Sequence, residues 1–273
     1  MKWTEELFGT KKAIIGLVHM SALPGDPYYD TVGGMEAVLE RTRADVLALQ
    51  EGGVDGLLFT NEYSVPYQSH FEFSQIAAMA YVMGALKDTI NLPFGADCIG
   101  DELASIELAS ATGAAFTRGI FHGTWATSEG IQLGKGAEAV RLRKKLDIEK
   151  FRLVYYITPE GGADFGGRDP IDIMKSIYFL NKPDGIAVAG YVAGQKPDAK
   201  VLQRCREAFP ESVLFAATGV KIENCREYLE NTDGAFIGTT FKKDGNFWNG
   251  VDQQRVKAFM DKVNSFRNLP TDY

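Results

Sequence analysis

Residues suited to acid–base chemistry stand at the ends of short apolar runs in this 273-residue sequence. His19 closes the first run, and the carboxylates Glu62, Asp97 and Glu160 close or follow three later runs. An imidazole titrates near neutral pH and suits proton transfer, while carboxylates in unlike surroundings can divide the roles of acid and base. The same side chains could instead hold a divalent metal ion, although no fixed spacing of ligands marks a metal site.

Small and hydroxyl-bearing residues follow the last two apolar runs and predict a site for an anion. Glycine lets backbone N–H groups approach an anion closely, and threonine hydroxyls add further donors. We expect phosphate or another anion at these turns, with Arg118 making a charge-assisted contact to the same ligand. The residues of this expected anion site are Thr218, Gly219, Gly238 and Thr239.

The remaining polar candidates are Asn61 and His122, which we expect to bind substrate because they also follow apolar runs. The third histidine, His70, is expected to begin a helix. No lysine closes an apolar run, and Lys242 and Lys243 are expected to be exposed to solvent. Because Schiff-base catalysis needs a lysine that points at the substrate, the sequence disfavours that chemistry.

Eight short and nearly continuous apolar runs predict parallel strands that are covered on both faces. Amphipathic segments separate them, and one such segment begins at the cap Asp169 and the helix-starting Pro170. The glycine-rich residues 160–167 are expected to form a mobile lid or a plain flexible loop. The expected strands are Ala13–Val18, Gly56–Phe59, Phe94–Asp97, Ala115–Gly119, Leu153–Ile157, Gly185–Val188, Val213–Ala217 and Ala235–Gly238.

Strand–helix units with short connections and no linker predict a (β/α)8 barrel of the TIM type, with residues 1–273 forming a single domain. The alternative is an open doubly wound sheet, which is less favoured because no G-x-G-x-x-G motif follows the first strand. In a (β/α)8 barrel the active site lies where the strands end and the following loops begin. The candidate residues would therefore meet at one end of the barrel.

The composition excludes several classes of protein. A formal net charge of −7 argues against a partner as acidic as nucleic acid. No stretch approaches the ~20 apolar residues of a transmembrane helix. Cys98, Cys205 and Cys225 have neither zinc-ligand nor redox-pair spacing, which is typical of reduced thiols in a cytosolic protein. We expect a cytoplasmic protein that binds a small molecule, and a homo-oligomer is compatible with the sequence.

Several stretches resemble the BtpA/SgcQ family. The opening of the family is matched by IGLVHM at 15–20 and LPG at 23–25, and then by GGVDG at 52–56, which leads to Asn61. Its end is matched by TGV at 218–220 and TTFKKDG at 239–245. The NEYS at 61–64 and the FKKDG at 241–245 look closer to the SgcQ branch, and Thr60 stands where the broader family usually has Glu.

The resemblance implies a TIM-type barrel related to phosphate-binding barrels. One branch of the family is associated with accumulation of photosystem I, and the SgcQ branch with sugar uptake and sugar-phosphate metabolism.

Three hypotheses for the function follow. The first is an enzyme that isomerises, epimerises or, with metal assistance, cleaves a phosphorylated sugar or related metabolite. The second is a non-catalytic stabilising or assembly factor. The third is a glycosidic-bond hydrolase that uses two separated carboxylates such as Asp97 and Glu160.

Overall fold

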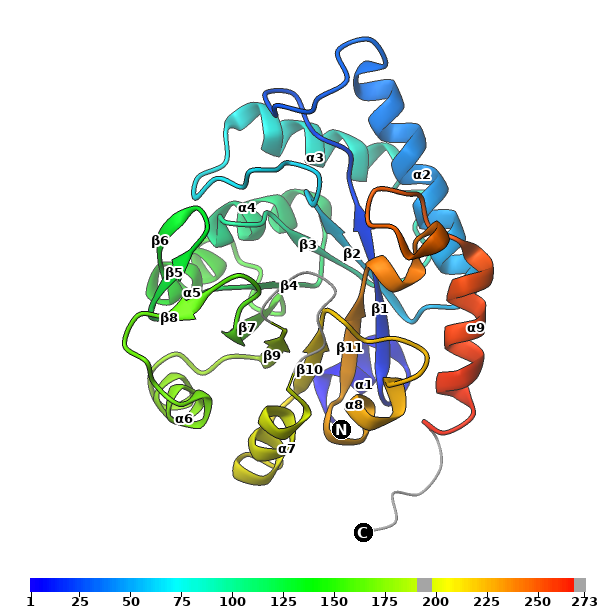
Figure 1. Cartoon of the computed structure of the whole chain (residues 1–273). Helices are drawn as coiled ribbons and strands as arrows, with labels where there is room; N and C mark the ends of the chain where they lie inside the picture. The colour runs from blue at the N-terminus through cyan, green and yellow to red at the C-terminus, as the bar shows by residue number, and fades with distance from the viewer. Residues whose placement is uncertain (191–197, 268–273) are drawn as a thin grey trace.

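The computed structural model describes residues 1–190 and 198–267, and within them eight parallel strands form a nearly closed barrel (Figure 1). The (β/α)8 class expected from the sequence is therefore confirmed. Every expected strand is present, with ends that differ by no more than a residue from those expected. In the order in which they pair, the strands are β3 (Phe94–Asp97), β2 (Gly56–Thr60), β1 (Ala13–His19), β11 (Gly234–Ile237), β10 (Leu214–Ala217), β9 (Gly185–Ala189), β7 (Arg152–Thr158) and β4 (Phe116–Gly119).

Helices surround this barrel on the outside (Figure 1). The helix α6 begins with Pro170 after the cap Asp169, whose side chain accepts the N–H of Ile171, as the sequence indicates. The described helices are α1 (Trp3–Phe8), α2 (Gly34–Gly52), α3 (Phe73–Ala85), α4 (Glu102–Thr112), α5 (Gly136–Lys145), α6 (Pro170–Leu180), α7 (Ala199–Ala208), α8 (Cys225–Asn231) and α9 (Gln253–Asn264), with the 3-10 turns η1 (Thr239–Phe241) and η2 (Lys243–Gly245) after β11.

The end strands β3 and β4 meet through their backbones and bring the sheet close to closure. The N–H of Ala115 donates to the carbonyl of Phe94 at 2.8 Å. Gly95 permits this approach, because a Cβ atom there would lie 2.6 Å from the carbonyl oxygen of Phe116. Away from this junction, β1 pairs with β2 along one edge and with β11 along the other. The first strand of the barrel therefore completes its pairing only with the last strand.

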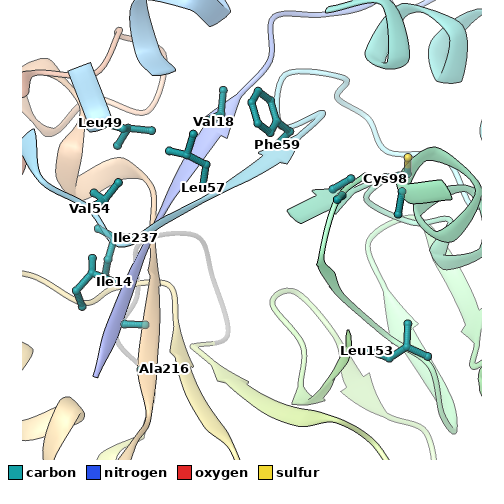
Figure 2. Close-up of a cluster of buried hydrophobic side chains, with 14 of the residues drawn as sticks. Ile14, Val18, Leu49, Val54, Leu57, Phe59, Cys98, Leu153, Ala216 and Ile237 are labelled. Carbon is teal, nitrogen blue, oxygen red and sulfur yellow. The ribbon is translucent and has the colours of Figure 1, made fainter. Parts of the chain in front are cut away.

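Side chains of β1 alternate between two hydrophobic layers, and this alternation directs His19 into the barrel. Ile15 and Leu17 belong to the inner layer, whereas Ile14 and Val18 belong to the outer layer that packs on the helices (Figure 2). His19 follows Leu17 by one step of two residues and therefore shares its inward direction. Because the strands are parallel, polar residues that end them and point inward all lie at the same end of the barrel, where the carboxyl ends of the strands meet.

The amino-terminal end of the barrel is closed by α1. The Trp3 ring lies 6.0 Å from the ring of Phe215, and the Phe8 ring lies 5.7 Å from that of Phe116, both inside the barrel. With aromatic side chains filling that end, the carboxyl ends of the strands are left as the open end. The site must therefore be built there.

A small antiparallel sheet lies beside the open end and was not expected from the sequence. Its strands pair in the order β6 (Gly130–Leu133), β5 (Thr124–Thr127) and β8 (Ala163–Asp164). The strand β8 falls inside the glycine-rich residues 160–167, where we expected a lid or a flexible loop. Part of that stretch is instead fixed by pairing with β5.

Candidate functional site

A cavity of about 690 Å³ opens at the carboxyl ends of the strands. This is the size of cavity that holds a small metabolite in other proteins. Leu17 and Phe236 of the inner layer form part of its floor. Most of the candidate residues from the sequence line its wall, namely His19, Glu62, Arg118, Glu160, Thr218, Gly219, Gly238 and Thr239.

Three candidates do not line the cavity, because each is engaged by a neighbour behind the wall. The Asn61 side-chain oxygen accepts the N–H of Ile99 at 2.8 Å. Asp97 accepts a hydrogen bond from Nε of Arg118 at 3.0 Å. His122 places Nε2 2.7 Å from the carbonyl of Tyr156. The structure therefore places Asn61, Asp97 and His122 against protein neighbours, while the catalytic role expected for Asp97 and the substrate binding expected for Asn61 and His122 stay predictions.

Arg118 of β4 is the buried cation at the inner end of the cavity. Its Nη2 lies 3.6 Å from a Glu62 oxygen, and its Nε is bonded to Asp97. The guanidinium also stacks within 5.1 Å of the Phe236 ring centre. Among the described residues, its Nη1 has no hydrogen-bond partner although it is buried. A buried donor without a partner is costly, so this nitrogen is suited to an acceptor on a ligand.

His19 stands beside Arg118 with its imidazole buried and unpaired. Its Nε2 is 3.8 Å from Glu62, which is too long for a hydrogen bond, and neither ring nitrogen has another partner within the described residues. Burial lowers the pKa of His19 well below its usual value, and the charges of Lys242 and Arg118 lower it further. The imidazole is therefore neutral at physiological pH, and it can donate a hydrogen bond but is a weak base.

Glu160 has the opposite behaviour and is the better proton carrier. It faces the open cavity at the end of β7, and burial by the surrounding walls raises its pKa to about 7, with the charge of Glu62 adding to the rise. Glu62 itself accepts a hydrogen bond from the Tyr67 hydroxyl at 3.2 Å. Burial also raises the pKa of Asp97 to about 6, against the opposing effect of Arg118. A carboxyl that titrates near neutrality suits general acid–base catalysis.

The loops after β10 and β11 form the outer end of the cavity and are tied to each other. The Thr240 hydroxyl donates to the carbonyl of Val220 at 2.7 Å, and the Asn224 amide donates to the carbonyl of Gly219 at 3.2 Å. Thr218 has a φ of 62°, which is strained for a residue with a side chain and is often found at functional sites. These bonds hold the expected anion-binding turns in place.

Two cations at this outer end were not among the site residues predicted from the sequence. Lys221 and Arg255 both line the cavity, and the Arg255 Nε donates to the carbonyl of Thr240 at 3.0 Å. Lys221 lies only two residues after Gly219, and this short separation in the sequence could have indicated that it belongs to the site. Arg255 lies on α9 and could not be placed from its neighbours in the chain, because the barrel folds that helix against the last strand loop.

Gly238 leaves space that the His19 side chain needs. A Cβ atom at this position would lie 2.7 Å from Nε2 of His19. The absence of a side chain at Gly238 therefore makes room for the imidazole. The expected approach of an anion to the Gly238 backbone stays a prediction, and Gly238 does line the cavity.

The expectation that Lys242 is exposed is wrong. Its side chain is fully buried, and its Nζ lies 2.8 Å from Asp45 of α2. The other oxygen of Asp45 accepts the N–H of Val251 at 2.7 Å, so the carboxylate joins both ends of the segment after β11. Lys242 does not line the cavity, and Lys243 is exposed as expected.

Residues 1–190 and 198–267 contain no group of three or more His, Cys, Asp or Glu placed to hold a metal ion. No helix in the same part of the chain is long and apolar enough to cross a membrane.

Comparison with known proteins identifies the relatives of this chain. The model of the BtpA family matches residues 10–265. The chain belongs to the BtpA family. It is 42% identical to the Escherichia coli K12 protein named "Putative sgc region protein SgcQ", over 98% of this chain and 100% of that protein. It is 26% identical to the Synechocystis "Photosystem I biogenesis protein BtpA", over 94% of this chain and 90% of the relative.

Solved structures place the BtpA family fold among TIM-barrel proteins. Phosphoribosyl anthranilate isomerase from Thermococcus kodakaraensis superposes with a TM-score of 0.55 at 14% identity, covering 94% of this chain and 100% of the isomerase. Likeness at this identity supports the fold only. What this BtpA-family chain does must be argued from its own cavity, which combines a neutral imidazole, a titratable carboxyl and a guanidinium with a free donor.

Proposed function

We propose that the protein is an acid–base enzyme that isomerises or epimerises a phosphorylated sugar or a related small metabolite. The observation that carries this proposal is the inner end of the cavity. There the Nη1 of Arg118 and both ring nitrogens of His19 are buried without partners in the described part of the chain. Folding leaves such polar atoms unsatisfied at a cost, which a ligand with both acceptor oxygens and a hydroxyl donor would offset.

Three side chains would share the chemistry. The Glu160 carboxylate would take a proton from a carbon next to a carbonyl group of the substrate. The negative charge that develops on the carbonyl oxygen would be stabilised by hydrogen bonds from neutral His19 and from Arg118. Glu160 would then return the proton to the neighbouring carbon, while His19 moves the hydroxyl proton from one oxygen to the other, which gives isomerisation. Epimerisation would instead need a second acid to protonate the same carbon from the other face.

The phosphate of the substrate would bind at the outer end. Gly219 and Thr239 supply backbone and hydroxyl donors there, and Lys221 and Arg255 supply positive charge. Anchoring a group that does not react would position the reacting carbon against Glu160. No step of this scheme requires a metal ion, and the lyase alternative with metal assistance remains a separate hypothesis.

Exchange of substrate hydrogen with solvent deuterium tests the proposal without knowledge of the product. A panel of aldose and ketose phosphates is incubated with the protein in D2O and followed by proton NMR. We expect loss of the signal from one carbon-bound hydrogen beside the carbonyl in at least one compound, and no loss with Glu160→Gln. Absence of exchange across the panel, with inorganic phosphate failing to bind as well, would falsify the proposal.

The alternative function for this chain is that of a non-catalytic assembly factor, which the word "biogenesis" in the name of the Synechocystis relative suggests. It predicts that substitutions inside the cavity are tolerated and that binding uses surface outside the barrel mouth. His19→Ala separates the two, because an enzyme loses its electrophilic donor while an assembly factor keeps its outer surface. Full function of His19→Ala in cells, together with capture of a protein partner by the purified variant, would favour the rival.

A further inference from the structure

The two ends of the cavity differ in charge, and this difference bears on the class of substrate. At the inner end of the described structure, Glu62 and Asp97 lie 3.6 and 3.0 Å from the guanidinium of Arg118, and Glu160 is near enough for the charges of Glu62 and Arg118 to affect its pKa. His19 adds no charge there because its imidazole is neutral. The inner end therefore carries an excess of negative charge whenever its carboxyl groups are ionised.

The outer end carries cations that face the same space. Lys221 and Arg255 line the cavity beside the turns after β10 and β11. Glu223 and Asp244 also line this end, and all four charged side chains there are exposed, so water and salt screen the acids and the cations alike. An anion at the outer end meets hydrogen-bond donors and no excess of negative charge, whereas an anion at the inner end would meet a cluster of acids.

A carboxylate on the substrate would be a poor ligand for the inner end. The guanidinium of Arg118 offsets only one of the two charges of Asp97 and Glu62, so a permanent carboxylate would add to the excess of negative charge. The charge on the carbonyl oxygen in the proposed reaction differs, because it forms only as Glu160 takes up a proton and becomes neutral. Repulsion between like charges a few ångströms apart in a partly buried site is large compared with thermal energy. An uncharged carbonyl or hydroxyl oxygen, in contrast, can accept from Nη1 of Arg118 and from His19 without adding charge.

We propose that the cavity selects phosphorylated compounds whose far end is an uncharged carbonyl or hydroxyl group, and that it rejects phosphorylated sugar acids. The selection rests on the proposed function, because it assumes that the phosphate occupies the outer end. The feature that the inner carboxylates distinguish is the charge of the substrate group that lies farthest from the phosphate. The matched compounds that differ in this feature are an aldose phosphate and the acid formed by oxidising its aldehyde carbon.

Calorimetric titration of the full chain with matched pairs tests the selection. The probes are glucose-6-phosphate against 6-phosphogluconate, and ribose-5-phosphate against 5-phosphoribonate, with inorganic phosphate as the probe of the outer end alone. Titrations are made near pH 8, where Glu160 is ionised, and at about 0.15 M salt, which screens charges far from the site. We expect the sugar phosphate of at least one pair to bind about tenfold or more tightly than its acid.

Two matched variants assign the effect to the inner end. Glu160→Gln removes a negative charge there. We expect it to reduce the ratio of the affinity for the sugar phosphate to the affinity for its acid, mainly because the acid binds more tightly. Glu223→Gln makes the same change at the exposed outer end and is expected to leave the ratio unchanged. Melting temperatures of both variants near that of the parent chain show that each is folded.

The outcomes separate this inference from the proposed function. Equal binding within every pair, or tighter binding of the acids, overturns the selection but leaves a phosphate-binding enzyme. Binding of inorganic phosphate with no binding of any sugar phosphate also overturns the selection. Failure of every probe, inorganic phosphate included, overturns both the selection and the anion site on which it rests. A ratio that responds to Glu223→Gln and not to Glu160→Gln overturns the role given to the inner acids.

Discussion

The inner and outer ends of the cavity are built by different parts of the fold. His19 and Arg118 are carried by strands, are buried, and keep polar atoms without partners in the described structure. The turns at Gly219 and Thr239 lie in loops that are held by hydrogen bonds from Asn224 to Gly219 within one loop and from Thr240 to Val220 between the loops. The comparison shows that the reactive groups are held by the barrel strands, while the loops of the anion end are ordered by hydrogen bonds to main-chain carbonyls.

The largest expected effect comes from removing the cation at the inner end. Arg118→Met leaves Asp97 and Glu62 buried without their partner, and we expect a loss of about 3–5 kcal/mol in the free energy of unfolding, measured with urea. The loss should shrink as the pH falls through the raised pKa of Asp97, because a protonated carboxyl needs no cation. Arg255→Met, at the outer end, should stay within about 0.5 kcal/mol of the parent. Similar losses for both variants would contradict the comparison.

A methyl group at Gly238 should disturb the inner end through His19. Because the new Cβ would collide with the imidazole, Gly238→Ala should cost about 1–3 kcal/mol and shift the NMR signals of His19. Gly219→Ala should cost about 1 kcal/mol through its left-handed backbone alone and leave those signals in place. Gly84→Ala is the control, because a Cβ there meets nothing within 4 Å and helix propensity favours alanine.

The pH dependence of deuterium exchange should report Glu160. The rate should rise with pH through about 7, because Glu160 must lose its proton to act as a base. Glu62→Gln removes the neighbouring negative charge that helps to raise this pKa, so the midpoint should move to lower pH by about a unit or less. Glu223→Gln should leave the midpoint where it is. A midpoint that moves upward in Glu62→Gln would exclude Glu160 as the titrating base.

The smallest effects are expected at the outer cations. Lys221→Gln and Arg255→Gln should each weaken binding of inorganic phosphate by about two- to fivefold, since exposed charges contribute up to about 1 kcal/mol. Neither should change the free energy of unfolding measurably. Lys243→Gln is the matched control, because Lys243 is exposed and lies outside the cavity wall. If Lys243→Gln weakened phosphate binding as much, the effect would belong to overall charge and not to the site.

The sequence predicted the barrel well because the fold depends on local patterns. Each strand is a short apolar run between glycine-rich or polar turns, and its inward register follows from alternation. Thus the position of His19 at the end of β1 could be read directly from IGLVH at 15–19. The small sheet was missed because β8 spans Ala163–Asp164, too short to show any pattern within its glycine-rich surroundings.

The direction that a polar side chain takes could not be read in the same way. Asp97 and Glu62 both follow strands, yet Asp97 is held behind the wall by Arg118 while Glu62 lines the cavity. Lys242 was placed in solvent because it precedes another lysine, but its partner Asp45 lies 197 residues away in the chain. Such choices are decided by partners that only the folded barrel brings together.

The seam between β1 and β11 has a consequence for how the chain is made. While a ribosome is still adding residues 61–233, β1 has its neighbour β2 but lacks the strand that covers its other edge. Asp45 likewise waits for Lys242, which follows it by 197 residues. A nascent chain of this protein therefore keeps one edge of β1 unpaired until β11 has been made, and an unpaired strand edge favours association with other chains.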